Sequence, residues 1–238
     1  PSEWWDACLE PIPLGPGEAT PLVIGADAAV SGDSFGIVVV SAHPNRPDAV
    51  AKRACFKFDP PQGGSINYGA TVEPLLRRLC AEYNVVELAY DPYQLHDMAT
   101  RLMGDGTVYC RPFPQGEARL QADKLLYDLI RERRISHGGS PELREHIANA
   151  NAKQGKLEDT KLRIVKKSES RKIDLVVALS MAAAECLRVN PVGRPLVAVD
   201  VFGTAGESRW KLGATPRDKD NGGGGGPALG GTSLWRKP

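Results

Sequence analysis

The sequence predicts an α/β protein built on one mixed β-sheet with helices on both faces. Three apolar stretches follow one another between residues 22 and 58, with Gly, Pro and Asp between them, which is the pattern of an antiparallel meander. After them, segments with helical spacing alternate with short apolar runs up to about residue 190. A meander followed by strand–helix alternation indicates a mixed sheet that is covered on both sides.

Six strands are expected, each a short run rich in apolar residues. The second contains the uninterrupted β-branched run Ile37–Val40, which is typical of a buried strand. A Gly-containing turn joins the first strand to the second. The expected strands occupy Leu22–Asp27, Phe35–Ser41, Ala51–Phe58, Val85–Tyr90, Val108–Phe113 and Leu162–Val165.

Five helices are expected where apolar residues recur three or four positions apart. In the first, Val72, Leu76 and Leu79 share one face. The last is rich in Ala, and we expect Ser168 or Ser170 to cap its amino terminus. The helices are expected over Asn67–Tyr83, Tyr93–Met103, Glu117–Arg134, Ser140–Ala150 and Ile173–Val189.

Three regions differ in composition. Residues 1–20 are rich in Pro and Gly and carry adjacent tryptophans, so we expect a linker arm that packs through its aromatic residues. Residues 21–190 hold all the expected strands and helices and form the main domain. Residues 191–238 form an extension, and its run of five glycines predicts disorder from about residue 214, because such a segment cannot offset the entropy of ordering.

Composition excludes several classes of protein. No apolar run reaches the ~18–20 residues of a membrane helix, so no membrane partner is expected. The five cysteines lack CxxC or Cys/His ligand spacing and are typical of reduced thiols, not of a zinc site or a disulfide framework. The formal net charge is only +1, so the distribution of charge is more informative than its sum.

Three aspartates stand at the ends of expected elements. Asp27 ends the first strand, Asp91 follows the fourth, and Asp174 lies in the first turn of the Ala-rich helix. A right-handed crossover through helix 67–83 would make the first and fourth strands parallel neighbours, with both carboxylates at one sheet edge. Small residues on the same face of the late helix as Asp174 would let that helix approach the sheet. We therefore expect the three acids to meet.

Clustered carboxylates point to metal chemistry. They repel one another, and protonation or a divalent cation relieves the repulsion. Oxygen ligands without His or Cys favour Mg²⁺ or Mn²⁺ over zinc. Two such ions ~3.5–4 Å apart suit phosphodiester hydrolysis, because one generates hydroxide and the other stabilises the leaving oxygen.

Each acid taken alone has a simpler interpretation. An Asp after a strand is commonly a turn former or a helix cap, and Asp91-Pro92 is a common helix start. Asp174 would also be favoured at a helix amino terminus by the helix dipole. A functional site is favoured over these interpretations because all three acids occur together, in this order of elements.

A basic stretch precedes Asp174. Residues 153–172 hold eight Lys and Arg against three acids, a local net charge of 8 − 3 = +5. Such a stretch can follow the DNA backbone beside the metals, and its candidate DNA-binding residues are Lys166, Lys167, Arg171 and Lys172. Arg171 and Lys172, nearest to Asp174, are the candidates for contact with the scissile phosphate. The alternative is a solvated loop without a ligand.

Three motifs carry a family resemblance. The segments GADAAVSGDSFGIVVV, ELAYDPYQ and RKIDLVVALSMAAAE resemble, in order and spacing, the nuclease domain of the large terminase subunit of tailed bacteriophages. The resemblance covers roughly residues 20–190. It implies the RNase H-like, or retroviral-integrase-like, fold: a central mixed five-stranded sheet in the order 3-2-1-4-5 with helices on both faces.

The resemblance also assigns the site. It implies that Asp27, Asp91 and Asp174 are the catalytic residues and bind two Mg²⁺ or Mn²⁺ ions. Asp33, in the turn after the first strand, is implied as an auxiliary ligand. The expected activity is that of a metal-dependent endodeoxyribonuclease that cuts concatemeric double-stranded DNA during viral packaging.

Partners and location follow from the same resemblance. The family protein has an ATPase domain, but no GxxxxGK[ST] motif occurs in these residues, so no ATP hydrolysis is expected of this chain. The small terminase subunit and the portal or capsid are the other implied partners, in the cytoplasm of the infected bacterial host. Two alternatives stay open: a Holliday-junction resolvase or transposase-like nuclease of the same fold, and a non-catalytic DNA-binding or capsid-docking module.

Overall fold

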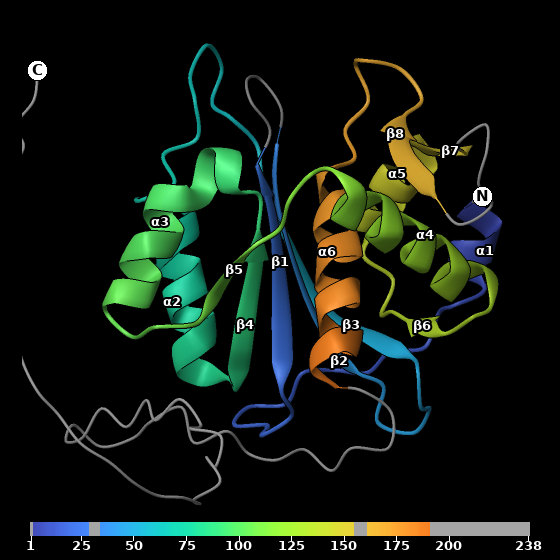
Figure 1. The fold of residues 1–238 in the computed structure, drawn as a ribbon, viewed down its shortest axis with the longest axis horizontal. Coiled ribbons are helices and arrows are strands. Elements are labelled where there is room, and N and C mark those ends of the chain that lie inside the picture. The colour runs from blue at the N-terminus through green and yellow to red at the C-terminus, as the bar shows by residue number, and fades with distance from the viewer. Residues whose placement is uncertain (1, 29–33, 155–160, 191–238) are drawn as a thin grey trace, which may run out of the picture. The chain divides into compact units, whose positions relative to one another are not determined.

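The computed structural model describes residues 2–28, 34–154 and 161–190. In this part of the chain a central β-sheet, seen edge-on in Figure 1, has helices on either side. Two regions named above lie outside the described residues: the turn that contains Asp33, and the extension 191–238, where the sequence predicts disorder from about residue 214.

The central sheet has the expected core order and one additional strand. Its strands follow one another in space as β5-β4-β1-β2-β3-β6. β2 pairs antiparallel with β1 and β3, whereas β4 pairs parallel with β1 and β5. The expected five-stranded order 3-2-1-4-5 is present, and β6, a two-residue strand that pairs with β3, extends it by one strand. The strands are β1 (Leu22–Ala28), β2 (Phe35–Ala42), β3 (Val50–Phe58), β4 (Val85–Tyr90), β5 (Cys110–Pro112) and β6 (Ile135–Ser136).

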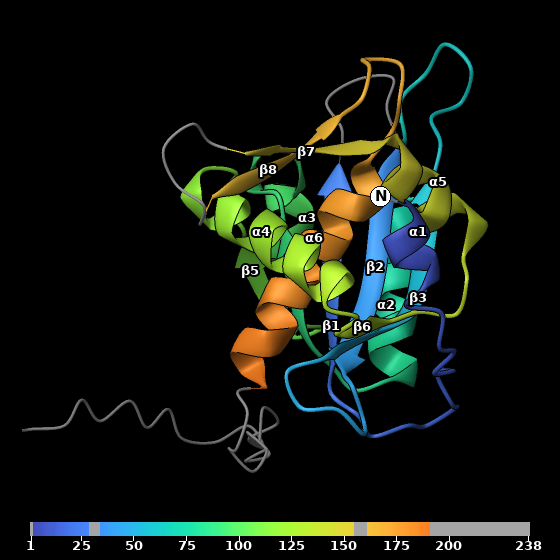
Figure 2. The ribbon, with the colours of Figure 1, turned by 90° about the vertical axis from the view of Figure 1, so that its right-hand side faces the viewer.

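Helices cover both faces of this sheet (Figures 1 and 2). On one face, α2 (Val72–Glu82) and α3 (Pro92–Gly104) pack on side chains such as Ile24 and Ile37. On the other, α4, α5 and α6 pack on the alternating set that includes Val23 and Val38. Within the described residues no helix is long and apolar enough to cross a membrane. The second group comprises α4 (Glu117–Arg131), α5 (Pro141–Asn149) and α6 (Asp174–Val189).

Because both faces are covered, every residue of β1 is buried, and so is β2 up to its last residue. This explains the uninterrupted apolar run at Ile37–Val40.

Two glycines allow α6 to lie directly on the sheet. A Cβ atom added at Gly25 would lie 2.0 Å from the main-chain oxygen of Ala178, and one added at Gly36 would lie 2.8 Å from the carbonyl carbon of Asp174. Glycine inside a strand commonly marks such a close approach of another backbone. The main chain of α6 therefore lies against Gly25 of β1 and Gly36 of β2.

Some element boundaries differ from the sequence-based expectation. α2 begins at Val72 and not at Asn67, because residues 67–71 form a turn in which the Asn67 carbonyl accepts from the Thr71 amide (3.0 Å). α4 ends at Arg131, shortly before Arg133 adopts a positive φ of 55°. A hairpin of β7 (Ala150–Gln154) and β8 (Leu162–Lys166) occupies the basic stretch, where only the second strand was expected.

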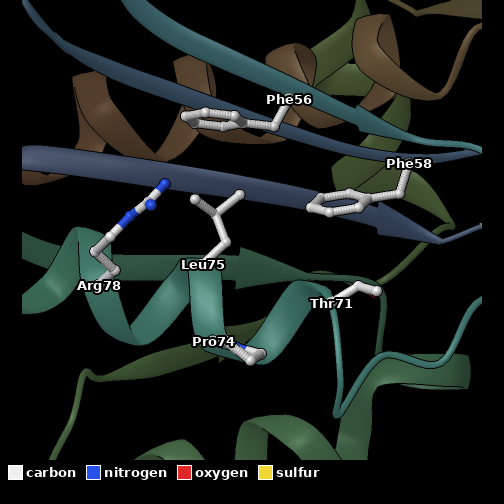
Figure 3. Close-up of a pocket in the computed structure, with 6 residues that line it drawn as sticks. All are labelled: Phe56, Phe58, Thr71, Pro74, Leu75 and Arg78. Carbon is white, nitrogen blue, oxygen red and sulfur yellow. The ribbon is translucent and has the colours of Figure 1, made fainter.

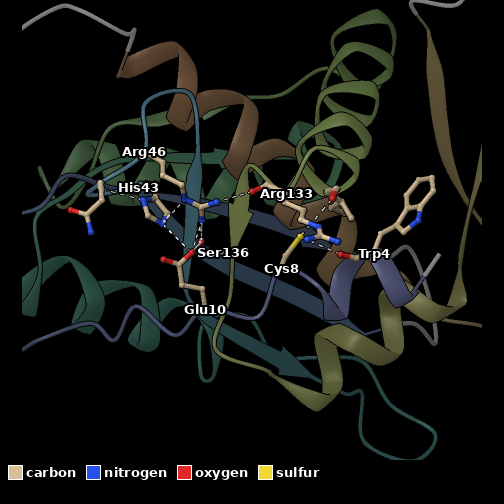
Figure 4. Close-up of polar contacts among 9 residues, drawn as sticks. Trp4, Cys8, Glu10, His43, Arg46, Arg133 and Ser136 are labelled. Carbon is tan, nitrogen blue, oxygen red and sulfur yellow. Dashed lines mark hydrogen bonds and ion pairs between the residues drawn. The ribbon is translucent and has the colours of Figure 1, made fainter.

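The amino-terminal segment contacts the domain extensively. It begins with α1 (Ser2–Asp6), whose Trp5 is 1% exposed and stacks on the His137 ring at 4.0 Å between centroids. Figure 4 shows the polar contacts that follow. Cys8 donates to the Trp4 carbonyl (3.2 Å), and Glu10 accepts from Ser136 Oγ (2.7 Å). A salt bridge of 2.6 Å also joins Glu10 to an arginine, Arg46, of the β2–β3 connection.

Candidate functional site

The carboxyl ends of β1 and β4 place Asp27 and Asp91 at one edge of the sheet. The two strands are parallel, and Ala26 pairs with Tyr90, so the next residue of each strand is an aspartate. This edge lies at the top of Figure 1, where α3 and α6 also begin. The close approach at Gly36 adds Asp174, because Gly36 pairs with Asp27 and contacts the first turn of α6. The topology thus places β1, β4 and the first turn of α6, which carry or precede these three aspartates, at one sheet edge.

Asp27 is buried in an environment that disfavours its charge. Asp27 is only 9% exposed. Burial is the main cause that raises the pKa of Asp27 to about 7; the Arg119 guanidinium lowers the pKa, and the carboxylates of Asp174, Asp91 and Asp123 contribute to the rise. The mutual influence of these carboxylates shows the repulsion that the sequence pattern predicts.

Asp174 is 3% exposed, and its carboxylate accepts a hydrogen bond from the residue directly before β2. Ser34, directly before β2, donates its hydroxyl to Asp174 Oδ2 at 2.5 Å. Next to it, the Leu175 amide donates to Nδ1 of His146 in α5 at 3.1 Å. Burial, and then the charge of Lys57, lower the pKa of His146 to about 4, so this ring is neutral and accepts the bond at pH 7.

His146 takes the place of the helix cap that the sequence suggested. Ile173 is the N-cap residue of α6 and has no side-chain capping bond, so the expectation of a cap at Ser168 or Ser170 is wrong. The physical reason is that the first turn is buried against α5, where an imidazole satisfies the amide that a hydroxyl would otherwise bind.

Asp91 has a structural contact as well as its place at the sheet edge. It is the N-cap of α3, and its carboxylate accepts from the Tyr93 amide at 3.0 Å. The helix-start interpretation of Asp91-Pro92 is therefore correct as local structure.

The donor chemistry of these acids fits a hard divalent cation. Their oxygens come without a Cys or His among them, and their repulsion would be relieved by positive charge. In the described part of the structure, however, no three His, Cys, Asp or Glu side chains stand at a spacing that could hold a metal ion. Two of the three carboxylates are engaged instead with Tyr93 and Ser34.

The basic residues expected to bind DNA have different surroundings. Lys172 pairs with Asp59 (3.1 Å), and Arg171 donates to Asn149 Oδ1 (3.4 Å). Lys167 is exposed and Lys166 is half-buried, at the end of β8. The two residues nearest Asp174 in sequence thus have protein partners.

Sequence reasoning missed a buried polar network beside the acids. Asp123 Oδ1 accepts from Arg119 Nε (2.7 Å) and from the Ser180 hydroxyl (2.7 Å), while Oδ2 accepts from the Ile164 amide (2.9 Å). Arg119 also donates to Gln115 Oε1 at 2.9 Å. This network joins α4, α6 and β8. The spacing of Arg119 and Asp123 was visible in the sequence, but such pairs are typical of exposed helix faces.

A hollow of about 520 Å³ lies elsewhere, between β3 and α2 (Figure 3). Phe56, Phe58 and Leu75 give it an apolar lining, and Arg78 stands at its side. It holds none of the three aspartates.

Known proteins resemble this chain in sequence and in fold. The family model described as "terminase large subunit, endonuclease domain" matches residues 52–189. The match includes Asp91 and Asp174 and begins after β1, which carries Asp27. No curated protein shows significant similarity to the chain.

Several solved structures share the fold. The large terminase of bacteriophage HK97 superposes with a TM-score of 0.66 at 17% identity, over 78% of this chain and 43% of that protein. The large terminase nuclease of thermophilic phage G20c gives a TM-score of 0.53 at 14% identity, over 70% of this chain and 82% of that one. The same nuclease with bound magnesium gives 0.52 at 14% identity, over 70% and 82%. This chain thus spans less than half the length of the HK97 terminase.

Proposed function

Because this chain belongs to the family of terminase large subunit endonuclease domains, we propose that it cleaves double-stranded DNA by metal-dependent phosphodiester hydrolysis. The observation that supports the proposal is that β1 and β4 are parallel neighbours that bring Asp27 and Asp91 to one sheet edge, where the first turn of α6, which carries Asp174, lies against Gly36. Ligand sites of open α/β sheets lie at such edges.

The three aspartates would hold Mg²⁺ or Mn²⁺. The bound-magnesium structure of the G20c nuclease supports Mg²⁺ as one such ion. Two ions, when bound, would supply activation of water and stabilisation of the leaving oxygen. Asp27 and Asp174 are buried and held by the sheet and by Ser34, so their oxygens are positioned in advance. Asp91, at a helix start, would have to release the Tyr93 amide or use its second oxygen.

The wider assignment rests on family membership. We propose that the substrate is concatemeric viral DNA, cut during packaging in the cytoplasm of the infected bacterium. The terminase ATPase domain, the small terminase subunit and the portal or capsid are the proposed partners. The candidate DNA-binding surface consists of Lys166, Lys167, Arg171 and Lys172, and Asp33 remains a candidate auxiliary ligand.

The test is plasmid cleavage by the 238-residue chain. We expect cleavage in Mg²⁺ or Mn²⁺, none in EDTA, and none with Asp27→Asn in either ion. Cleavage in EDTA, or a requirement for zinc, would contradict the proposed chemistry. DNA binding without cleavage in any divalent ion would favour a non-catalytic module. Preference for a four-way junction over linear duplex would favour a resolvase of the same fold.

A further inference from the structure

One arginine of the β7–β8 hairpin is directed toward the candidate site by main-chain contacts. The Ile164 amide is held by Asp123, so β8 is attached to α4 next to this residue. Arg163 Nη1 donates to the Gln115 carbonyl at 2.9 Å. Gln115 closely follows β5, where the Phe113 amide donates to the carbonyl of Tyr90. The Arg163 guanidinium is therefore attached at the same sheet edge as Asp91.

Arg163 differs from the neighbouring Arg119 in having no described acidic partner. Arg119 is buried and has its own counter-ion in Asp123. Arg163 is half-buried, and no described Asp or Glu forms an ion pair with it. Burial and then the charge of Arg119 lower the pKa of Arg163, whereas Asp123 and Asp27 raise it.

From this placement we propose that Arg163 contacts the DNA phosphate at the candidate site and is a catalytic residue of the cleavage reaction; the inference rests on the proposed function. A guanidinium with one nitrogen anchored on a carbonyl retains donors for a phosphate. Its planar fork can bind two phosphate oxygens at once, which an ammonium cannot. Without an acidic partner among the described residues, Arg163 need not break an ion pair there to bind DNA.

The variants are Arg163→Gln and Arg163→Lys, with Arg78→Gln as the matched control, because Arg78 is an exposed arginine of α2 outside the basic stretch and the candidate site. In Mn²⁺ we expect Arg163→Gln to lower kcat ~100-fold, the size of effect that removal of one positioned donor has. Arg163→Lys should recover only part of the rate. Arg78→Gln should keep the wild-type kcat.

A second measurement separates this inference from the proposed function. Duplex binding in Ca²⁺, without cleavage, should weaken at least tenfold in Arg163→Gln, while its melting temperature stays within about 2 °C of wild type. If the wild type cleaves DNA and Arg163→Gln cleaves it with the same kcat, the inference is overturned and the proposed function stands. If the wild type binds DNA but never cleaves it, the proposed function fails. If Arg163→Gln binds duplex DNA in Ca²⁺ as tightly as the wild type does, the proposed contact between Arg163 and the phosphate is wrong.

Discussion

At the scale of single residues, the candidate site contains a carboxylate, that of Asp27, in a buried position where its charge is unfavourable. Asp27 lies inside a fully buried strand, where a carboxylate would normally be replaced by an apolar residue. Its pKa is raised from 3.8 to about 7, so the folded protein holds a proton on Asp27 more tightly than the unfolded chain does. Ionisation of Asp27 therefore destabilises the fold, and this cost is fully present only above pH 7.

Asp27→Asn should accordingly raise stability while abolishing cleavage. In EDTA, wild-type stability should contain a contribution that falls from about pH 4 to pH 7, and the variant should lack it. The gain above pH 7 is at most ~4 kcal/mol, from about three pKa units. Urea unfolding at pH 5 and pH 8, with plasmid cleavage in Mn²⁺, measures both effects. A variant that is less stable at pH 8 would show that this interpretation of the burial is wrong.

Asp91 allows its two roles to be separated by choice of substitution. Asn retains a side-chain oxygen for the Tyr93 amide, whereas Ala does not. We expect Asp91→Asn to leave the free energy of unfolding nearly unchanged and Asp91→Ala to lower it by ~1 kcal/mol. Both should lose cleavage by orders of magnitude if the carboxylate binds metal. Normal cleavage by Asp91→Asn would restrict Asp91 to the capping role.

At the scale of elements, α6 is positioned by its neighbours and not by its own sequence signals. Gly36 lets its first turn contact β2, and His146 satisfies the Leu175 amide from α5. Ser34 then holds the Asp174 carboxylate. The position of this one catalytic candidate thus depends on three residues from two other segments of the chain.

Gly36→Ala should disturb that arrangement. The added methyl group would lie 2.8 Å from the Asp174 carbonyl carbon, and main-chain atoms cannot move aside as a flexible side chain does. We expect a loss of ~1–3 kcal/mol in the free energy of unfolding, with lower cleavage in the folded fraction. Gly104→Ala is the control, because a Cβ atom there meets nothing within 4 Å. Equal melting temperatures for the two variants would contradict the close approach.

At the scale of the whole molecule, helices on both faces of the sheet produce two separate apolar cores. The amino-terminal segment contributes to the one beneath α4 and α6, since Trp5 and Cys8 belong to it. The part that resembles an arm in composition therefore adds a buried aromatic side chain to the described domain.

Trp5→Ala should for this reason destabilise the domain as a core substitution does. The ring stacks on His137 and is almost fully buried, so we expect a loss of ~3–5 kcal/mol. Trp4→Ala is the matched control, because Trp4 is 37% exposed and should cost less than ~1 kcal/mol. Thermal unfolding of the two variants measures the difference. Similar melting temperatures would mean that the segment is only loosely attached.

The sequence by itself determined the alternation of elements, the fold class and the three aspartates at element ends. These features are local, because the periodicity of apolar residues and the turn residues report on the nearest neighbours along the chain. Asp27 lies outside the matched family segment, and its place near the end of a strand is predicted from the sequence alone. Of the hairpin only β8 was predicted, and β6 and β7 were not, because short strands carry little periodic signal.

Only the tertiary structure decided which polar groups meet. The Ser34–Asp174 bond joins residues 140 positions apart, and Arg163 reaches Gln115 across 48. No periodicity encodes such distances. The buried pair Arg119–Asp123 is indistinguishable in sequence from an exposed helix pair, and the neutral state of His146 follows from burial against α6. Charge and protonation depend on surroundings that the chain acquires only when distant segments pack together.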